Sequence, residues 1–158
     1  MIRGIKIIKL TKLPIDLSKW VDWLNDKIVT KYSKQRLKKH TNQSQKKFLK
    51  KKLKSKRNFI FKIIYNKKFI GVLELSDINH KKKTCELSYM IGNISDWGKG
   101  IATKAINLAL TYSKKKLFLK KVYAGAHKEN IPSKKILLKN NFLITKKNKT
   151  YLFFERVL

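Results

Sequence analysis

The chain of 158 residues is expected to form a single α/β (α+β) domain over residues 1–158, and three observations predict this fold class. Several short runs alternate apolar and polar residues, which is typical of strands. Other runs carry apolar residues at helical spacing. The two kinds of run follow one another in the order β-α-α-βββ-α-β-α-ββ, which predicts a sheet covered by helices.

The first two elements occupy the N-terminal part of the chain. Residues 3–9 (RGIKIIK) read as a strand. Residues 13–26 (LPIDLSKWVDWLND) predict a short helix, because Leu17, Trp20 and Leu24 recur at helical spacing. We assign Trp20 to the packing of this helix.

A second helix and a hairpin are expected next. Residues 27–40 give no clear pattern and end in RLKKH. Thr41 is a candidate N-cap for a helix over residues 42–56, whose lysines form a solvated face. Residues 58–66 and 68–76 flank a short turn and predict a β-hairpin.

The second half of the chain continues the alternation of strands and helices. Asn130 is a candidate N-cap, and Pro132 fits the first turn of the helix that follows. The expected elements are a strand at 84–92, a helix at 101–117, a strand at 120–127, a helix at 131–140, and a hairpin of 142–147 with 150–157.

Charge is the dominant compositional feature, with 40 basic and 9 acidic residues and a net charge of +31. One interpretation is a nucleic-acid or ribosome binder. However, only four of the basic residues are arginines, the side chain that base recognition favours. Lysine, asparagine and isoleucine are all frequent, as AT-rich codons would give. We therefore favour genome composition as the cause, with nucleic-acid binding as the alternative; the basic surface would still attract anionic ligands.

Other sequence features indicate the cellular compartment and exclude a metal site. No apolar run reaches the roughly 18 residues of a transmembrane helix, and the N-terminus lacks a signal-peptide pattern. The lone Cys85 has no internal disulfide partner, so we expect a cytoplasmic protein in which it packs in the core. No His/Cys cluster has metal-binding spacing, and no metal is expected.

The stretch SDWGKGIATKAI, residues 95–106, holds two glycines directly before an apolar helical run. Gly98 and Gly100 permit close approach of a ligand, and the start of a helix directs backbone N–H groups and positive potential at one point. Lys99 and Lys104 add charge. The spacing matches neither a Walker loop nor a dinucleotide fingerprint. The stretch is therefore either a phosphate cradle or a plain loop before a helix.

Two motifs together with the order of elements resemble one family. WGKGIATKA at 97–105 and NIPSKKILLKNNF at 130–142 look like the GNAT acetyltransferase superfamily. The similarity is to the branch of ribosomal-protein N-terminal acetyltransferases and amino-sugar acetyltransferases. It implies a mixed, mostly antiparallel sheet of six to seven strands flanked by about four helices, and acetyl-coenzyme A (acetyl-CoA) as the acetyl donor.

The resemblance also implies donor-binding residues. Members of the family splay two central strands, so the main chain of Met90 and Ile91 would pair with the pantetheine arm. Asn130 and Ser133 would reach the pantetheine and thiol region. The pyrophosphate would be held at the glycine loop by Trp97, Gly98, Lys99, Gly100, Ile101, Ala102 and Thr103.

Three positions depart from the family pattern. Ser95 stands where many members have Gln or Arg, and Asn141 replaces the last motif glycine. Asparagine tolerates the left-handed conformation that a helix end needs. Leu137 occupies the position at which many members carry a tyrosine acid, so Ser133 or water is expected to protonate the departing thiolate.

The rare acidic residues provide candidate bases. Glu74 (GVLELS) and Glu86 (CELSYMI) lie in apolar strand sequences, where a carboxylate either finds a partner or has a raised pKa. A raised pKa suits a base that takes a proton from an ammonium. The E-x-x-Y-x-I pattern favours Glu86 as that base, and pairing of each carboxylate with a lysine is the alternative.

The N-terminal third resembles the acceptor segments of amino-sugar members. The expected acceptor-binding residues are Trp23, Asn25, Arg36, His40 and Glu74. The predicted function is acetyl-CoA-dependent transfer of acetyl to a primary amine, preferably a small amine such as a nucleotide-linked amino sugar. A protein N-terminus is the alternative acceptor, and a non-catalytic basic module that binds RNA or ribosomes is the rival function. We expect a monomer or homodimer without a membrane partner.

Overall fold

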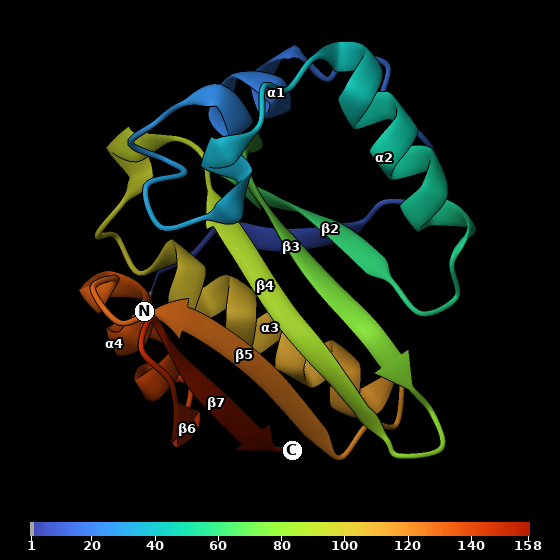
Figure 1. The fold of residues 1–158 in the computed structure, drawn as a ribbon. Coiled ribbons are helices and arrows are strands. Elements are labelled where there is room, and N and C mark those ends of the chain that lie inside the picture. Colours follow the sequence, from blue (N-terminus) through green and yellow to red (C-terminus); the bar gives the residue numbers. More distant parts are fainter. Residues whose placement is uncertain (1) are drawn as a thin grey trace.

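The computed structural model describes residues 2–158 and contains one seven-stranded sheet with helices on both faces (Figure 1). The helices are α1 (Ser18–Asn25), α2 (Asn42–Lys54), α3 (Ile101–Lys115) and α4 (Ile131–Lys139), with short 3₁₀ helices η1 (Lys34–Leu37) and η2 (Ile94–Asp96). The strands are β1 (Ile5–Lys9), β2 (Phe59–Tyr65), β3 (Lys68–Asn79), β4 (Thr84–Ile91), β5 (Lys121–His127), β6 (Leu143–Lys147) and β7 (Tyr151–Val157).

The strands lie in the order β1-β2-β3-β4-β5-β7-β6. Neighbouring strands are antiparallel except β4 and β5, which run parallel. This confirms the predicted fold class, a mixed but mostly antiparallel sheet with flanking helices. The parallel pair is joined through α3, since parallel neighbours need a crossover connection.

Strands β4 and β5 separate along their length. Their pairing ends at Glu86 and Tyr123, whereas β4 continues to pair with β3 as far as Ile91. Figure 1 shows the two strands diverging from that point. The sheet therefore has an opening beside residues 87–91 of β4, and the predicted splay of two central strands is present.

The main chain of β4 alternates between the two sides of this opening. The N–H of Gly92 donates to the carbonyl of Ile70, 2.8 Å away, just past the end of the β3–β4 ladder. In an antiparallel pair the hydrogen-bonding direction alternates residue by residue. Met90 therefore directs its N–H and C=O toward β3, while Tyr89 and Ile91 direct theirs into the opening.

Two apolar clusters hold the layers together. Helices α3 and α4 cover one face of the sheet, where Ala105, Ile106 and Leu137 are buried against strand residues such as Ile63 and Leu73. Helices α1 and α2 cover the β2–β3 part of the other face with Trp20, Trp23, Leu24 and Leu49. The opening between β4 and β5 thus lies between the two helical layers.

The helix caps agree with the sequence expectations. The Thr41 side chain accepts a hydrogen bond from the N–H of Ser44, and the Thr41 N–H donates one to the Ser44 hydroxyl oxygen, which completes a capping box. Asn130 caps α4 in the same way, through the N–H of Ser133. Asn141 has φ +60°, so it takes the left-handed conformation expected at the end of α4.

Some predicted boundaries were wrong. The first helix begins at Ser18 rather than at residue 13, because the Asp16 carboxylate accepts the Ser18 N–H and holds the preceding chain in a turn. Strand β3 runs to Asn79 rather than residue 76, because an irregularity after Ser76 allows its pairing with β4 to resume.

Candidate active site

The glycine loop ends in an open helix N-terminus. Gly98 and Gly100 have φ +75° and +79°, values that L side chains rarely adopt. A Cβ added at either glycine would have no neighbour within 4 Å, so the space in front of both is free. Lys104 is the first residue at this end of α3 whose N–H bonds to the carbonyl four residues before it, that of Gly100. The N–H groups of the first turn are therefore directed outward, where an anion would bind them.

Side chains fasten this loop to the end of β4. The indole N–H of Trp97 donates to the carbonyl of Ile91 at 2.8 Å, and Asp96 forms a 2.9 Å ion pair with Lys99. The hydrogen bond from Lys99 lowers the pKa of Asp96, with a smaller contribution from Asn93. These contacts hold the loop at the wide end of the opening between β4 and β5.

Helix α4 approaches the opening from the other strand. Its N-cap Asn130 holds the Ser133 backbone, and the Ser133 hydroxyl lies 2.9 Å from the hydroxyl of Tyr89 on β4. Burial raises the pKa of Tyr89, and the hydrogen bond with Ser133 lowers it in part. Leu137, one turn further along α4, is 1% exposed and packs in the core. The hydroxyl groups of Tyr89 and Ser133 therefore both lie on this side of the opening.

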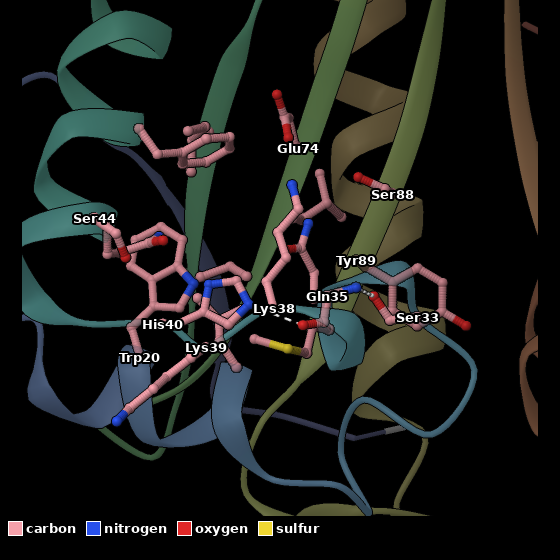
Figure 2. Close-up of a pocket in the computed structure, with 17 residues that line it drawn as sticks. Trp20, Ser33, Gln35, Lys38, Lys39, His40, Ser44, Glu74, Ser88 and Tyr89 are labelled. Carbon is pink, nitrogen blue, oxygen red and sulfur yellow. Dashed lines mark hydrogen bonds between the residues drawn. The ribbon is translucent and has the colours of Figure 1, made fainter.

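A cavity of about 470 Å³ lies on the face of the sheet that carries α1 and α2 (Figure 2). It is enclosed by η1, the start of α2 and strands β2 to β4. The lining residues are Trp20, Leu24, Ser33, Gln35, Lys38, Lys39, His40, Ser44, Gln45, Phe48, Ile60, Val72, Leu73, Glu74, Ser88, Tyr89 and Met90. We call this cavity the acceptor pocket, because it adjoins the free edge of β4.

The acceptor pocket has a positive wall and one carboxylate. Lys38, Lys39 and His40 come from one short segment, and Figure 2 shows the Lys38 side chain extending toward Glu74. Glu74 accepts a hydrogen bond from Lys52 at 2.6 Å, which neutralises it. The charge at the pocket is therefore positive.

Glu86 lies outside the acceptor pocket but on the same face of β4 as Ser88 and Met90. It occupies the last β4–β5 pair, where the opening begins. Glu86 is an exposed residue whose carboxyl group is partly desolvated. This partial desolvation raises its pKa, and the carboxylates of Asp77 and Glu74 raise it further.

The sheet is split, the start of α3 is suited to bind an anion, and a pocket adjoins the split. This arrangement agrees with the comparison to known families. Residues 8–143 match the family described as Acetyltransferase (GNAT) domain. The chain belongs to the GNAT acetyltransferase family. It is therefore an acyltransferase of the N-acetyltransferase type, as the sequence motifs predicted. A search of curated protein sequences found no significant match to this GNAT chain.

Several solved structures share its fold across nearly the whole chain. Spermidine N-acetyltransferase from Vibrio cholerae, in complex with CoA and spermine, is 20% identical with a TM-score of 0.85, covering 98% of this chain and 95% of that one. The N-acetyltransferase PseH from Campylobacter jejuni, in complex with acetyl coenzyme A, is 22% identical with a TM-score of 0.72, covering 97% and 98%. A domain from Methanocaldococcus jannaschii is 22% identical with a TM-score of 0.79, covering 98% and 99%.

The GNAT fold brings two of the expected acceptor residues, His40 and Glu74, to the acceptor pocket. Trp23 instead packs its ring on Phe69 and on Gly92, where no room remains for a side chain. Trp20, which we had assigned to packing alone, is buried but also lines the pocket.

Asn25 and Arg36 stabilise the segment between α1 and α2. The Asn25 side chain exchanges two 2.8 Å hydrogen bonds with the main chain of His40. Arg36 donates to the carbonyl of Lys31. Neither lines the pocket in this structure. Both hold the segment that carries Lys38, Lys39 and His40.

Sequence reasoning missed several pocket residues. Lys38 and Lys39 stand in the quoted RLKKHT segment, but nothing in the sequence distinguishes them from the other lysines. Ser88 and Tyr89 follow Glu86 in β4, and strand alternation would have placed Ser88 on the same face as Glu86. The segment from Ser33 to Gln35 had no readable pattern.

Several site classes find no support in residues 2–158. Cys85 is buried, and desolvation raises its pKa to about 12, so its thiol is inert as a nucleophile. The His, Cys, Asp and Glu side chains of this part of the chain form no group of three that would hold a metal ion. None of its helices has the length and apolar character that crossing a bilayer requires.

Proposed function

We propose that this GNAT enzyme transfers the acetyl group of acetyl-CoA to the primary amine of a small, negatively charged acceptor, such as a nucleotide-linked amino sugar. The observation that carries the acceptor class is the charge of the acceptor pocket. Lys38 and Lys39 line it, and its carboxylate, Glu74, is already paired with Lys52. Phosphate groups would find complementary charge there.

The residues present fit acetyl-CoA. Its pyrophosphate would bind the outward N–H groups at the start of α3 and the open loop formed by Trp97, Gly98, Lys99, Gly100, Ile101, Ala102 and Thr103. The pantetheine arm fits the free edge of β4 that ends at Met90 and Ile91, with Asn130 and Ser133 opposite. The Vibrio cholerae and Campylobacter jejuni neighbours hold CoA and acetyl-CoA, which supports the same donor. Acetyl-CoA supplies the acetyl group as a thioester.

Within the opening, Tyr89 and Ile91 would contribute more main-chain groups than Met90 does. The main chain of Met90 is directed to Val72 on β3, and the carbonyl of Ile91 already accepts the Trp97 indole N–H. The N–H groups of Tyr89 and Ile91 are directed into the opening. They would donate to the pantetheine or to the negative charge that develops on the reacting carbonyl oxygen.

Glu86 would act as the general base. It lies at the narrow end of the opening and on the face of the acceptor pocket, and its pKa is raised. It would take the proton of the acceptor ammonium, directly or through a water molecule. Much of the rate enhancement would come from holding the amine beside the thioester.

The distribution of lysines supports genome composition, rather than a nucleic-acid-binding surface, as the cause of the high net charge. Lysines lie on each of the four α-helices and on five of the strands. A nucleic-acid binder gathers its basic residues on one face or stripe. The distribution favours an enzyme with a generally basic surface over a non-catalytic RNA-binding module.

An acetylation screen read by mass spectrometry tests the proposal. The panel contains nucleotide-linked amino sugars, spermidine and peptides with free N-termini. We expect acetyl transfer to the nucleotide-linked amines. In the Lys38→Glu variant the KM for these amines should rise roughly 10-fold or more, because the substitution reverses one charge in the acceptor pocket. The matched control is Lys115→Glu at the end of α3, which is exposed and outside the pocket. Acetylation of spermidine or of peptide N-termini in preference would contradict the acceptor class.

A further inference from the structure

Tyr89 crosses the opening between β4 and β5. It lies in the segment of β4 that follows the last pair with β5, and it stands at the edge of the acceptor pocket. Figure 2 shows its ring extending away from Trp20, His40 and Ser44. The hydroxyl at the far end of the ring lies 2.9 Å from the Ser133 hydroxyl on α4. Tyr89 therefore reaches from the acceptor pocket to the helix on the donor side.

The proposed reaction needs a proton at this place. Breaking a thioester releases a thiolate, which leaves more readily when a positioned acid protonates it. Leu137 on α4 has an apolar side chain and is buried in the core. The Ser133 hydroxyl is an aliphatic alcohol, a far weaker acid than a phenol, and it is already engaged with Tyr89.

Resting on the proposed function, we infer that Tyr89 is the proton donor to the departing thiolate and that Ser133 positions it. As the new nitrogen–carbon bond forms and the carbon–sulfur bond breaks, the sulfur keeps the bonding electron pair and takes the proton of the Tyr89 hydroxyl. The phenolate recovers a proton from solvent through the Ser133 hydroxyl. The acceptor nitrogen loses two protons, one to Glu86 as the ammonium becomes the free amine and a second as the amide forms. Both pass to solvent, and Tyr89 takes one back, so each turnover releases one proton and leaves the protein unchanged.

The surroundings of Tyr89 hold its hydroxyl in place. Burial raises its pKa and the hydrogen bond with Ser133 offsets part of that rise, so the hydroxyl carries its proton at neutral pH before the reaction. Ser133 is itself fixed, because its N–H donates to the N-cap side chain of Asn130. The donor hydroxyl is thus held by a chain of two hydrogen bonds from α4, and the ring is held by β4.

The decisive variant is Tyr89→Phe, which keeps the ring and removes the hydroxyl. We expect kcat to fall by about 100-fold or more, the low end of what general acid catalysis contributes, while both KM values stay within about threefold. Tyr65→Phe on β2, outside both sites, is the matched control and keeps full activity. A kcat within threefold of the parent for Tyr89→Phe overturns the inference.

Ser133 variants separate positioning from proton donation. Ser133→Ala should lower kcat by roughly 10-fold, less than Tyr89→Phe does, and Ser133→Thr should recover most of the loss because it keeps a hydroxyl. A loss in Ser133→Ala that exceeds the loss in Tyr89→Phe would instead make Ser133 the donor and overturn the assignment.

A readout without turnover keeps the inference testable if the acceptor screen fails. CoA carries a thiol that desulfo-CoA lacks. The difference between the ultraviolet spectra of the protein bound to CoA and bound to desulfo-CoA therefore reports on a tyrosine hydroxyl beside the sulfur. We expect a tyrosine signal in the parent and in Tyr65→Phe, and its loss in Tyr89→Phe. An absent signal in a parent that binds CoA overturns the inference, whereas a present signal with no acetylated amine contradicts only the proposed function.

Discussion

Glu74 and Glu86 lie on the same face of the sheet, and the fold gives them different partners. Glu74 forms an ion pair with Lys52 at 2.6 Å. Glu86 lies instead where partial desolvation and the carboxylates of Asp77 and Glu74 raise its pKa. A carboxylate held by a lysine suits a structural or acceptor-orienting role. A carboxylate with a raised pKa at the start of the opening suits a base.

Glu86→Gln should lower kcat by about 100-fold at neutral pH while acetyl-CoA still raises the melting temperature of the variant as it does that of the parent. The ionised carboxylate is the base, so the rate of the parent should rise as pH increases through the pKa of Glu86, which lies above the ordinary value. The Glu86→Gln variant should lack this rise of rate with pH. A pH–rate profile of each protein measures the difference, and a fully active variant would remove Glu86 from the mechanism.

The thermal stability of Glu86→Gln provides the control for this variant. A carboxyl whose pKa is raised in the folded protein contributes stability at low pH, and this contribution is lost as pH rises through the folded-state pKa. Glu86→Gln should therefore melt no lower than the parent at neutral pH. A lower melting temperature would mean that lost activity reflects damage to the fold rather than the missing base.

The glycine loop and α3 act as one element. The loop is tied to β4 through Trp97 and Ile91, and α3 begins at Gly100 with its first N–H groups directed outward. Helix N-termini favour anions because the unpaired N–H groups and the helix dipole act in the same direction. The loop and helix would therefore present one anion site beside the wide end of the opening.

Gly100→Glu should abolish the rise in melting temperature that acetyl-CoA gives. The substitution places a negative charge at the helix start and a side chain where φ is +79°. Gly100→Asn is the control, since asparagine tolerates this conformation and adds no charge. Thermal melts with and without acetyl-CoA measure the effect. A persistent ligand-induced rise in Gly100→Glu would place the pyrophosphate elsewhere.

At the scale of the whole molecule, a net charge of +31 acts on a fold of 158 residues. With 9 acidic residues against 40 basic ones, ion pairs such as Lys52–Glu74 and Lys121–Glu155 can offset only part of the repulsion between lysines. Self-repulsion destabilises a compact state and is weakened by salt, with a Debye length of about 10 Å at 0.1 M. The same positive field would attract an anionic acceptor.

Added sodium chloride should therefore raise the melting temperature of the ligand-free protein and raise the KM for an anionic acceptor. Both effects follow from screening, the first of repulsion between lysines and the second of attraction to the substrate. Melts and initial rates across a salt series measure them, with sucrose as a control for non-ionic solvent effects. A melting temperature that falls with salt would show that ion pairs outweigh repulsion.

Local sequence patterns were enough to predict the order of strands and helices along the chain, the caps at Thr41 and Asn130, and the left-handed residue Asn141. These features depend on residues within a turn or two of each other, so local conformation and backbone geometry are enough to predict them. The GNAT family was indicated by two distant motifs read together, and the loop around Gly98 and Gly100 stays a predicted anion site.

Only the tertiary structure decided which side chains meet. It placed Trp20 in the acceptor pocket and Trp23 against Phe69, and it paired Tyr89 with Ser133, 44 residues further along the chain. Contacts of this kind depend on where each strand lies in the sheet and on how each helix packs against it. Strand order arises from the packing of the whole core, and the divergence of β4 from β5 was expected only from the family resemblance, so no local pattern encodes either feature.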